Sequence, residues 1–254
     1  MKLGLEHFAH LNSPIHRWAP VPKLLGLGTL IFAFSSVQTL IVLPGMMVIT
    51  AGLFSLSRLP LTFWWQRLKL PGLFLIGLVI ALPFISGETP IFQWGILRLY
   101  GEGLQAIVLI SVRFVCILTL GLILFGTAPF LNTITALRSL GLPPLLADMI
   151  LLSYRYIYEI GDYFQSMRKA VKLRGFRSDR PNLKTLKTLS ALAGSLIIRS
   201  YEQSEQVYKA MLMRGYGQGA SVAERARFCS QDWALLGVTV GSAIAILLAE
   251  VLLG

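Results

Sequence analysis

Five apolar runs constrain the fold of this chain more than any other feature. They are residues 24–40, 43–56, 71–85, 104–126 and 233–253. Only 14% of the residues are charged, against about 25% in an ordinary soluble domain. A helix that crosses a hydrocarbon core about 30 Å thick needs about 20 apolar residues, and the second and third runs are short for this. We predict an all-α integral membrane protein with about five transmembrane helices.

The placement of Lys and Arg predicts the orientation, because cytoplasmic loops of membrane proteins retain basic residues. The formal net charge is +11. With a cytoplasmic N-terminus, nearly all of this charge lies inside and only Arg98 lies outside. We predict a multi-pass protein of the plasma (inner) membrane, with four apolar runs in 1–126, a long cytoplasmic amphipathic segment at 127–232 and a final transmembrane helix at 233–254. Binding of nucleic acid is the weaker explanation of the charge.

Several local features complete this prediction. Residues 1–20 lack a long apolar core, so no signal peptide is expected. Two cysteines, Cys116 and Cys229, imply no disulfide framework. We expect loops at 58–69, which is basic and carries two Trp residues, and at 86–103. A turn is expected at Pro44-Gly45.

Arg113 interrupts the fourth apolar run. A charge at the centre of a bilayer costs at least about 2.5 kcal/mol, so its side chain should face the protein interior or a partner. We favour a structural role, either paired with an acidic residue or extended toward the membrane surface. A place on a transport path is the alternative.

An octet that occurs twice marks the cytoplasmic segment. Residues 169–176 and 209–216 share Lys, Ala, Leu or Met, Arg, Gly and an aromatic residue at six of eight positions. We predict one helix from Leu145 to Arg174-Gly175. A second runs from about Leu183 to Arg214-Gly215, either continuous or in two pieces around Gly194. Gly suits the left-handed residue that closes a helix.

Two explanations of the repeat are open. An Arg in the last turn interacts favourably with the helix dipole by about 0.3–1 kcal/mol, and this local effect would account for a single copy. It does not require the shared Ala or aromatic residue. Two Arg side chains at two helix ends would also suit docking into acidic grooves, because the guanidinium is planar and permanently charged.

Each cytoplasmic helix has an apolar stripe and a polar face at helical spacing. The stripes are Ile150, Tyr154, Ile157, Gly161 and Phe164 on the first helix, and Ile197, Tyr201, Ser204, Tyr208 and Met211 on the second. On the polar faces, Arg155 can pair with Glu159, and Arg199 and Glu202 lie on the second helix.

The sequence lacks the motifs of the common catalytic sites. It has no Gly-x-x-x-x-Gly-Lys-Ser/Thr phosphate-binding loop, no His-Glu-x-x-His and no cysteine pair at metal spacing. His7 and His10 could touch a metal together, but they and His16 fit surface or interface positions better. We predict a chain that is not an enzyme and needs no cofactor or metal.

The residues resemble a known family most closely between 142 and 217. Gly194-Ser195-Leu196-Ile197-Ile198-Arg199-Ser200-Tyr201-Glu202, and the stretch from Val207 to Tyr216, closely resemble the transmembrane T component of energy-coupling factor (ECF) transporters, above all its CbiQ type. Tyr154-Arg155-Tyr156-Ile157, Asn12-Ser13-Pro14-Ile15-His16-Arg17 and Pro22-Lys23-Leu24-Leu25 are similar to the same family.

The resemblance implies a scaffold that joins a substrate-binding membrane S component to two cytoplasmic ABC-type ATPases. It implies that Arg174 with Gly175, and Arg214 with Gly215, contact the ATPases, together with Ala170 and Ala210. It places Arg155, Arg199 and Glu202 in structural or coupling roles. The chain departs from the family's Ala-Arg-Gly at Leu173 and Met213. It further implies uptake of cobalt or nickel.

Other functions stay open at this point. The T component of a vitamin importer, for example for biotin, would have the same features, because the S component selects the substrate. A substrate-binding ABC permease is another alternative. A membrane enzyme or a self-sufficient carrier would need polar groups within its spans, and these are nearly absent here.

Overall fold

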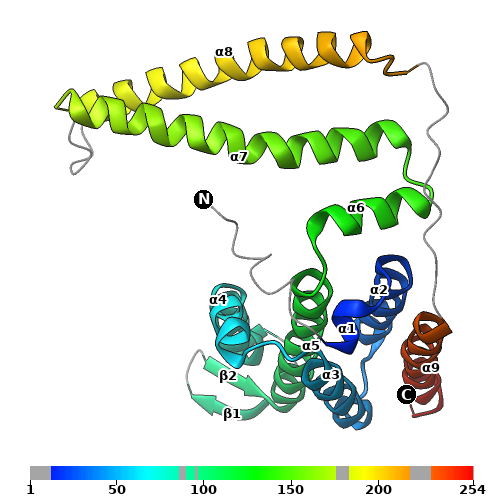
Figure 1. Ribbon diagram of the computed structural model, residues 1–254. Helices are drawn as coiled ribbons and strands as arrows, with labels where there is room; N and C mark the ends of the chain where they lie inside the picture. The colour runs from blue at the N-terminus through cyan, green and yellow to red at the C-terminus, as the bar shows by residue number, and fades with distance from the viewer. Residues whose placement is uncertain (1–12, 86–89, 95–96, 176–182, 218–229, 254) are drawn as a thin grey trace. The chain divides into compact units, whose positions relative to one another are not determined.

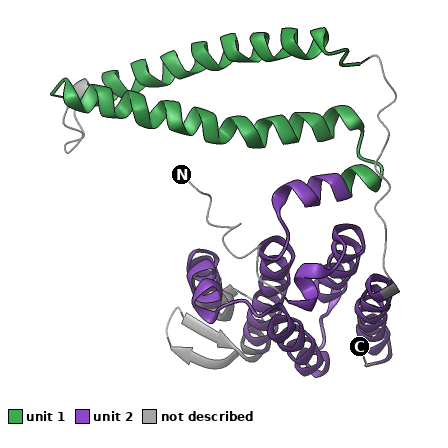
Figure 2. Cartoon of the chain, in the orientation of Figure 1, with its two compact units in different colours: residues 1–3, 137–225 green, residues 4–136, 226–254 purple. Residues whose placement is uncertain are grey.

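The computed structural model describes residues 13–85, 90–94, 97–175, 183–217 and 230–253. The chain forms two compact units, one of residues 4–136 with 226–254 and the other of 1–3 with 137–225 (Figure 2). Apart from one short hairpin, the described elements are helices (Figure 1). The protein is an all-α membrane protein, as predicted.

The unit of residues 4–136 with 226–254, unit 2 in Figure 2, contains a helix for each of the five apolar runs. These are α2 (Pro20–Ser36), α3 (Leu43–Ser57), α4 (Leu61–Ile85), α5 (Gly101–Gly126) and α9 (Ser230–Leu253). Among the described residues, three stretches are long and apolar enough to cross a membrane, namely Leu40–Ser57, Gln105–Gly126 and Gln231–Leu252. The helix Pro20–Ser36 is apolar but shorter.

Smaller elements connect these helices. A four-residue helix α1 (Pro14–Arg17) precedes α2, and a 3-10 helix η2 (Leu40–Val42) leads into α3. The predicted turn at Pro44-Gly45 is wrong, because both residues lie in the first turn of α3, a position that suits Pro.

Both predicted loops contain regular structure. Most of 58–69 belongs to α4, and Trp64 Nε1 donates a hydrogen bond to Thr119 Oγ1 of α5 at 2.9 Å. The tryptophan that suggested an interfacial loop therefore helps to join two helices. Within 86–103, β1 (Pro90–Trp94) and β2 (Leu97–Tyr100) form an antiparallel hairpin.

Helices α2 and α9 of this unit lie parallel to each other. At one end, Asp232 Oδ1 of α9 accepts a hydrogen bond from the Ala19 amide, just before α2, at 2.9 Å. At the other end, Glu250 Oε1 accepts from the amides of Gln38 and Thr39 at 2.7 and 3.0 Å. Glu250 Oε2 also accepts from Thr39 Oγ1 at 2.6 Å. Two carboxylates about 27 Å apart along α9 thus hold both ends of α2.

Arg113 of α5 binds at the same end of α2. Its guanidinium donates to the carbonyl oxygens of Ser35 and Val37 at 3.2 and 3.1 Å. A cation is favourable there because the last carbonyls of a helix carry partial negative charge. The structural explanation of Arg113 fits these contacts, but its partners are backbone carbonyls and not the expected acidic residue.

The core of this unit lies among α2, α3, α5 and α9. Fully buried side chains include Leu27, Leu30, Phe34, Met46 and Leu120. Lys23 is also buried, at 1% exposure, and its Nζ donates to the carbonyl of Ile15 at 3.1 Å. Helices α2 and α9 approach each other closely at Gly26, where an added Cβ would clash with Thr239 Oγ1 and lie 3.1 Å from the Trp18 ring.

We predict that Gly26→Ala destabilises the chain by about 1–3 kcal/mol, the usual cost of overpacking. Thr239 has little freedom to move, because its hydroxyl donates to the carbonyls of Leu235 and Leu236. The measurement is the thermal unfolding midpoint of the full chain in detergent.

Gly28→Ala is the matched control on the same helix. No atom lies within 4 Å of a Cβ at Gly28, so this change should be neutral or stabilising by up to about 1 kcal/mol. Thr239→Ala in the Gly26→Ala background should restore part of the lost stability. Equal midpoints for the two glycine variants would show that α2 and α9 do not approach closely at Gly26.

Candidate functional site

The unit of residues 137–225, unit 1 in Figure 2, contains a hairpin of two long helices, α7 (Pro144–Leu173) and α8 (Leu183–Met213). They run side by side in opposite directions (Figure 1). Helix α8 continues through Gly194, so the alternative of two pieces is wrong. Because α7 ends where α8 begins, Arg174 and Arg214 lie at opposite ends of the hairpin, about 45 Å apart for helices of this length.

The first predicted helix end forms as the sequence indicates. The amide of Arg174 donates to the carbonyl of Ala170 at 3.2 Å, and that of Gly175 donates to Lys172 at 3.1 Å. Gly175 has φ +86°, in the left-handed region that glycine tolerates best. Its backbone therefore ends α7 and leaves the Arg174 side chain exposed at the terminus. Phe176 lies outside the described residues.

The second end has the same construction. The amide of Arg214 donates to Ala210 at 3.3 Å, and Gly215, with φ +79°, donates to Leu212 at 3.0 Å. The Tyr216 amide donates to Met211 at 3.0 Å. The last two bonds together form a Schellman motif, the most common way to close a helix with glycine.

An exposed apolar side chain precedes each Arg. Leu173 is 88% exposed and Met213 is 91% exposed. These are the two positions where the chain departs from the family's Ala. Each helix end therefore presents a cation beside an unburied apolar group, a combination that suits a groove with an acidic and an apolar wall.

Arg199, predicted on the polar face of α8, contacts α7 near the middle of the hairpin. Its guanidinium carbon lies 3.8 Å from the centre of the Tyr163 ring on α7, a cation–π contact. Tyr163 Oη in turn donates to Glu159 at 3.4 Å. The predicted ion pair of Arg155 with Glu159 does not form within the described part of the chain, and Arg155 is exposed.

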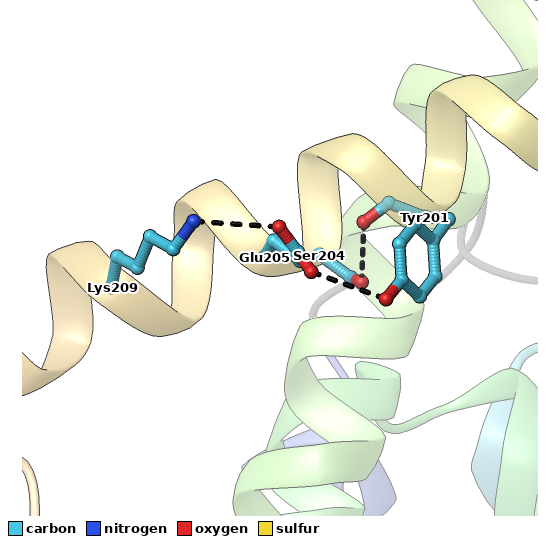
Figure 3. Close-up of polar contacts among 4 residues, drawn as sticks. All are labelled: Tyr201, Ser204, Glu205 and Lys209. Carbon is cyan, nitrogen blue, oxygen red and sulfur yellow. Dashed lines mark hydrogen bonds and ion pairs between the residues drawn. The ribbon is translucent and has the colours of Figure 1, made fainter.

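Glu202 is also exposed, and the hydrogen bonds on this side of α8 belong to its neighbour Glu205. Tyr201 Oη donates to Glu205 Oε1 at 3.1 Å, and Lys209 Nζ lies 3.4 Å from Glu205 Oε2 (Figure 3). The contacts run along one face of α8. They stabilise that helix and do not join it to α7.

The predicted apolar stripe of α8 does not face α7. Ile197, Tyr201 and Tyr208 are 69%, 65% and 60% exposed. Leu192 is buried, and Leu196 and Val207 are half-buried. A pair of helices can bury only a narrow seam on each member, so the broader apolar face of α8 remains uncovered.

Three residues that the sequence did not single out as a group meet where α8 returns to the start of α7. Tyr216 Oη donates to Asp148 Oδ2 at 3.0 Å, and Arg138 Nη1 lies 3.7 Å from Asp148 Oδ1. The hydrogen bond to Asp148 raises the pKa of the Tyr216 phenol above its ordinary value, so the donor proton stays in place at neutral pH. Tyr216 is the aromatic residue of the second octet, but Asp148 is 68 residues away and no local pattern connects them.

The histidines give no evidence of a metal centre. Within the described ranges, no three His, Cys, Asp or Glu side chains form a group that could hold a metal ion. His16 Nδ1 lies 2.6 Å from Ser13 Oγ. His7 and His10 lie outside the described residues.

We predict that Gly215→Ala and Gly175→Ala each destabilise their helix end by about 1–2 kcal/mol, because an alanine is strained at a left-handed φ. Hydrogen exchange of the amides in the last turn of each helix would measure the loss. Gly161→Ala, inside α7 where a Cβ would meet open space, is the control and should not speed exchange. Unchanged exchange in both variants would contradict the glycine-closed ends.

The apolar helices and the hairpin of two long helices with exposed Arg residues at its ends define an all-α membrane protein. Comparison with known proteins agrees with that class. A family model described as a cobalt transport protein, CbiQ, matches residues 11–224. The chain belongs to this family.

Its relatives include transmembrane proteins of energy-coupling factor transporters. The EcfT protein of Limosilactobacillus fermentum is 29% identical over 89% of this chain and 87% of its own length. That of Streptococcus equi subsp. equi is 29% identical over 92% and 90%. That of Bacillus subtilis is 29% identical over 89% of each chain. The resemblance inferred from the sequence is thus confirmed, and the chain is a membrane component of a transporter.

Proposed function

We propose that this chain is the non-catalytic scaffold of an ECF-type importer. In this proposal it couples the motion of two ABC-type ATPase subunits to a substrate-binding membrane S component. Arg174 and Arg214 each contact one ATPase. The single observation that carries the proposal is the repeated helix end, an exposed Arg beside an exposed apolar residue, at the two ends of one hairpin.

The distance between Arg174 and Arg214 supports binding of two ATPase subunits and not of a single one. Sites about 45 Å apart suit two copies of an ATPase, each with its own groove. An Arg fork pairs with a carboxylate through two parallel hydrogen bonds, which fixes the geometry as well as the charge. Leu173 and Met213 add apolar contact at the same two places. The sequence itself carries no phosphate-binding loop, which is consistent with ATP hydrolysis in a partner.

We propose a cytoplasmic N-terminus and a cytoplasmic hairpin, with residues 127–232 as the coupling segment, in a plasma (inner) membrane protein. The distribution of Lys and Arg supports this orientation. The parallel pairing of α2 with α9 is consistent with it, because parallel spans begin on the same side of the membrane.

We propose cobalt or nickel as the imported ion, on the basis of the family description. The names of the three relatives specify no ion, and a vitamin importer remains the second candidate. Identification of the S component that co-purifies from native membranes would decide between them. Binding of an ion or vitamin by the purified chain alone would favour a substrate-binding permease.

The docking proposal predicts that Arg174→Ala and Arg214→Ala each reduce co-purification of the ATPases. The loss of a charge-assisted contact at an interface typically costs 2 kcal/mol or more, or about thirty-fold in affinity. The double variant should lose the ATPases and uptake altogether. Arg→Lys should retain only part of the binding, because Lys lacks the planar fork.

Arg168→Ala is the control, since Arg168 is exposed on α7 but lies outside the repeated end. All variants must reach the membrane in equal amounts. The proposal is wrong if both single variants and the double variant retain co-purification and uptake.

A further inference from the structure

The two helix ends share their backbone but differ in the aromatic residue. The second octet ends in Tyr216 and the first in Phe176, whose ring has no hydroxyl. Tyr216 donates to Asp148 in the second turn of α7, and the other oxygen of that carboxylate faces Arg138 at the end of α6 (Phe130–Ser139). The C-terminal end of α8, which carries Arg214, is therefore linked to Asp148 of α7 and Arg138 of α6, on the two sides of the α6–α7 turn.

We propose that Tyr216, Asp148 and Arg138 are positioning residues that make the two helix ends unequal. Through them, a displacement of Arg214 reaches the α6–α7 turn directly. At the equivalent position of the first octet the sequence has Phe176, whose ring carries no hydroxyl. The inference rests on the proposed function, because it assumes that an ATPase contacts Arg214.

The backbone on both sides of this link is well defined. On the α8 side, the Schellman bonds fix Gly215 and Tyr216 relative to Arg214. On the other side, Leu142 donates to Leu137 at 3.0 Å and Gly141, with φ +111°, donates to Arg138 at 3.2 Å. The C-terminal end of α8 is thus linked to the C-terminal end of α6, which a glycine also closes, through the side chains of Tyr216, Asp148 and Arg138. Because hydrogen bonds fix both backbone segments, a displacement of one segment would move the other.

The position of α6 in the sequence gives this link its importance. Phe130, the first residue of α6, follows the last residue of α5, Gly126, by four positions. The α6–α7 turn is therefore one of the two covalent connections between the apolar helices and the hairpin, the other being the segment between α8 and α9. A link that moves this turn acts on the segment through which the hairpin connects with α5.

The first experiment tests the link in the full-length chain in detergent, without partners. Tyr216→Phe removes one hydrogen bond and should speed amide exchange of residues 212–217 about five-fold. Tyr208→Phe is the matched control, since the Tyr208 hydroxyl of the same helix forms no hydrogen bond within the described residues. Asp148→Asn keeps an acceptor oxygen and should have a smaller effect. Equal exchange in wild type and Tyr216→Phe would overturn the proposal.

The second experiment uses the complex with its co-purified ATPases and a non-hydrolysable ATP analogue. In wild type the analogue should change amide exchange at residues 137–147 and at 168–175. In Tyr216→Phe the ATPases should remain bound and the change at 168–175 should persist, but the change at 137–147 should be lost. A merely structural role of Tyr216 would not make one nucleotide response disappear selectively.

The outcomes separate this inference from the proposed function. Survival of the response at 137–147 in Tyr216→Phe, or its absence in wild type, overturns the inference and leaves ATPase docking intact. If Arg214→Ala keeps the ATPases bound, the docking proposal is wrong, while the exchange data on the isolated chain still show whether Tyr216 holds the α6–α7 turn.

Discussion

The membrane unit depends on the pairing of α2 with α9. Asp232 and Glu250 of α9 accept amide hydrogen bonds at the two ends of α2, and Arg113 of α5 binds the last carbonyls of the same helix. In a hydrocarbon environment an unsatisfied backbone group costs several kcal/mol, so side chains that satisfy helix ends have a large effect. Because α9 follows the hairpin in the chain, this pairing also returns the chain to the unit that it left at residue 136.

The arrangement explains how a long insertion between α6 and α9 can coexist with a compact membrane unit. Residues 137–225 begin in the last turn of α6 and the chain returns before α9, so most of α6 and all of α9 belong to the unit that α2 and α9 close. The hairpin can therefore respond to partners while the unit that carries it keeps its own core. The uncovered apolar face of α8 fits the same division, since a helix that serves partners need not bury its whole stripe on its own chain.

Local chemistry was predictable from the sequence, and long-range pairing was not. The ends at Arg174-Gly175 and Arg214-Gly215 follow from residues within one turn, so glycine and spacing were sufficient to place them. The partner of Arg113 could not be predicted, because backbone carbonyls at the end of a helix have no residue signature. The exposure of the predicted stripe of α8 could not be foreseen, because periodicity shows that a face is apolar and does not show what covers it. The contact of Tyr216 with Asp148 depends on the antiparallel path of the hairpin.

The antiparallel path also limits how the two Arg ends can move. Two helices that crossed at one point could rotate about it, but α7 and α8 touch in the middle through Tyr163 and Arg199 and again at one end through Asp148 and Tyr216. Because α7 and α8 contact each other at two points along their length, neither contact can act as a pivot for rotation of one helix against the other. If the proposed ATPases bind the two ends and approach each other, they would strain the hairpin along its length or move it as one body. In either case, under the proposed link of Tyr216 with Asp148 and Arg138, the displacement would pass into the chain at the α6–α7 turn.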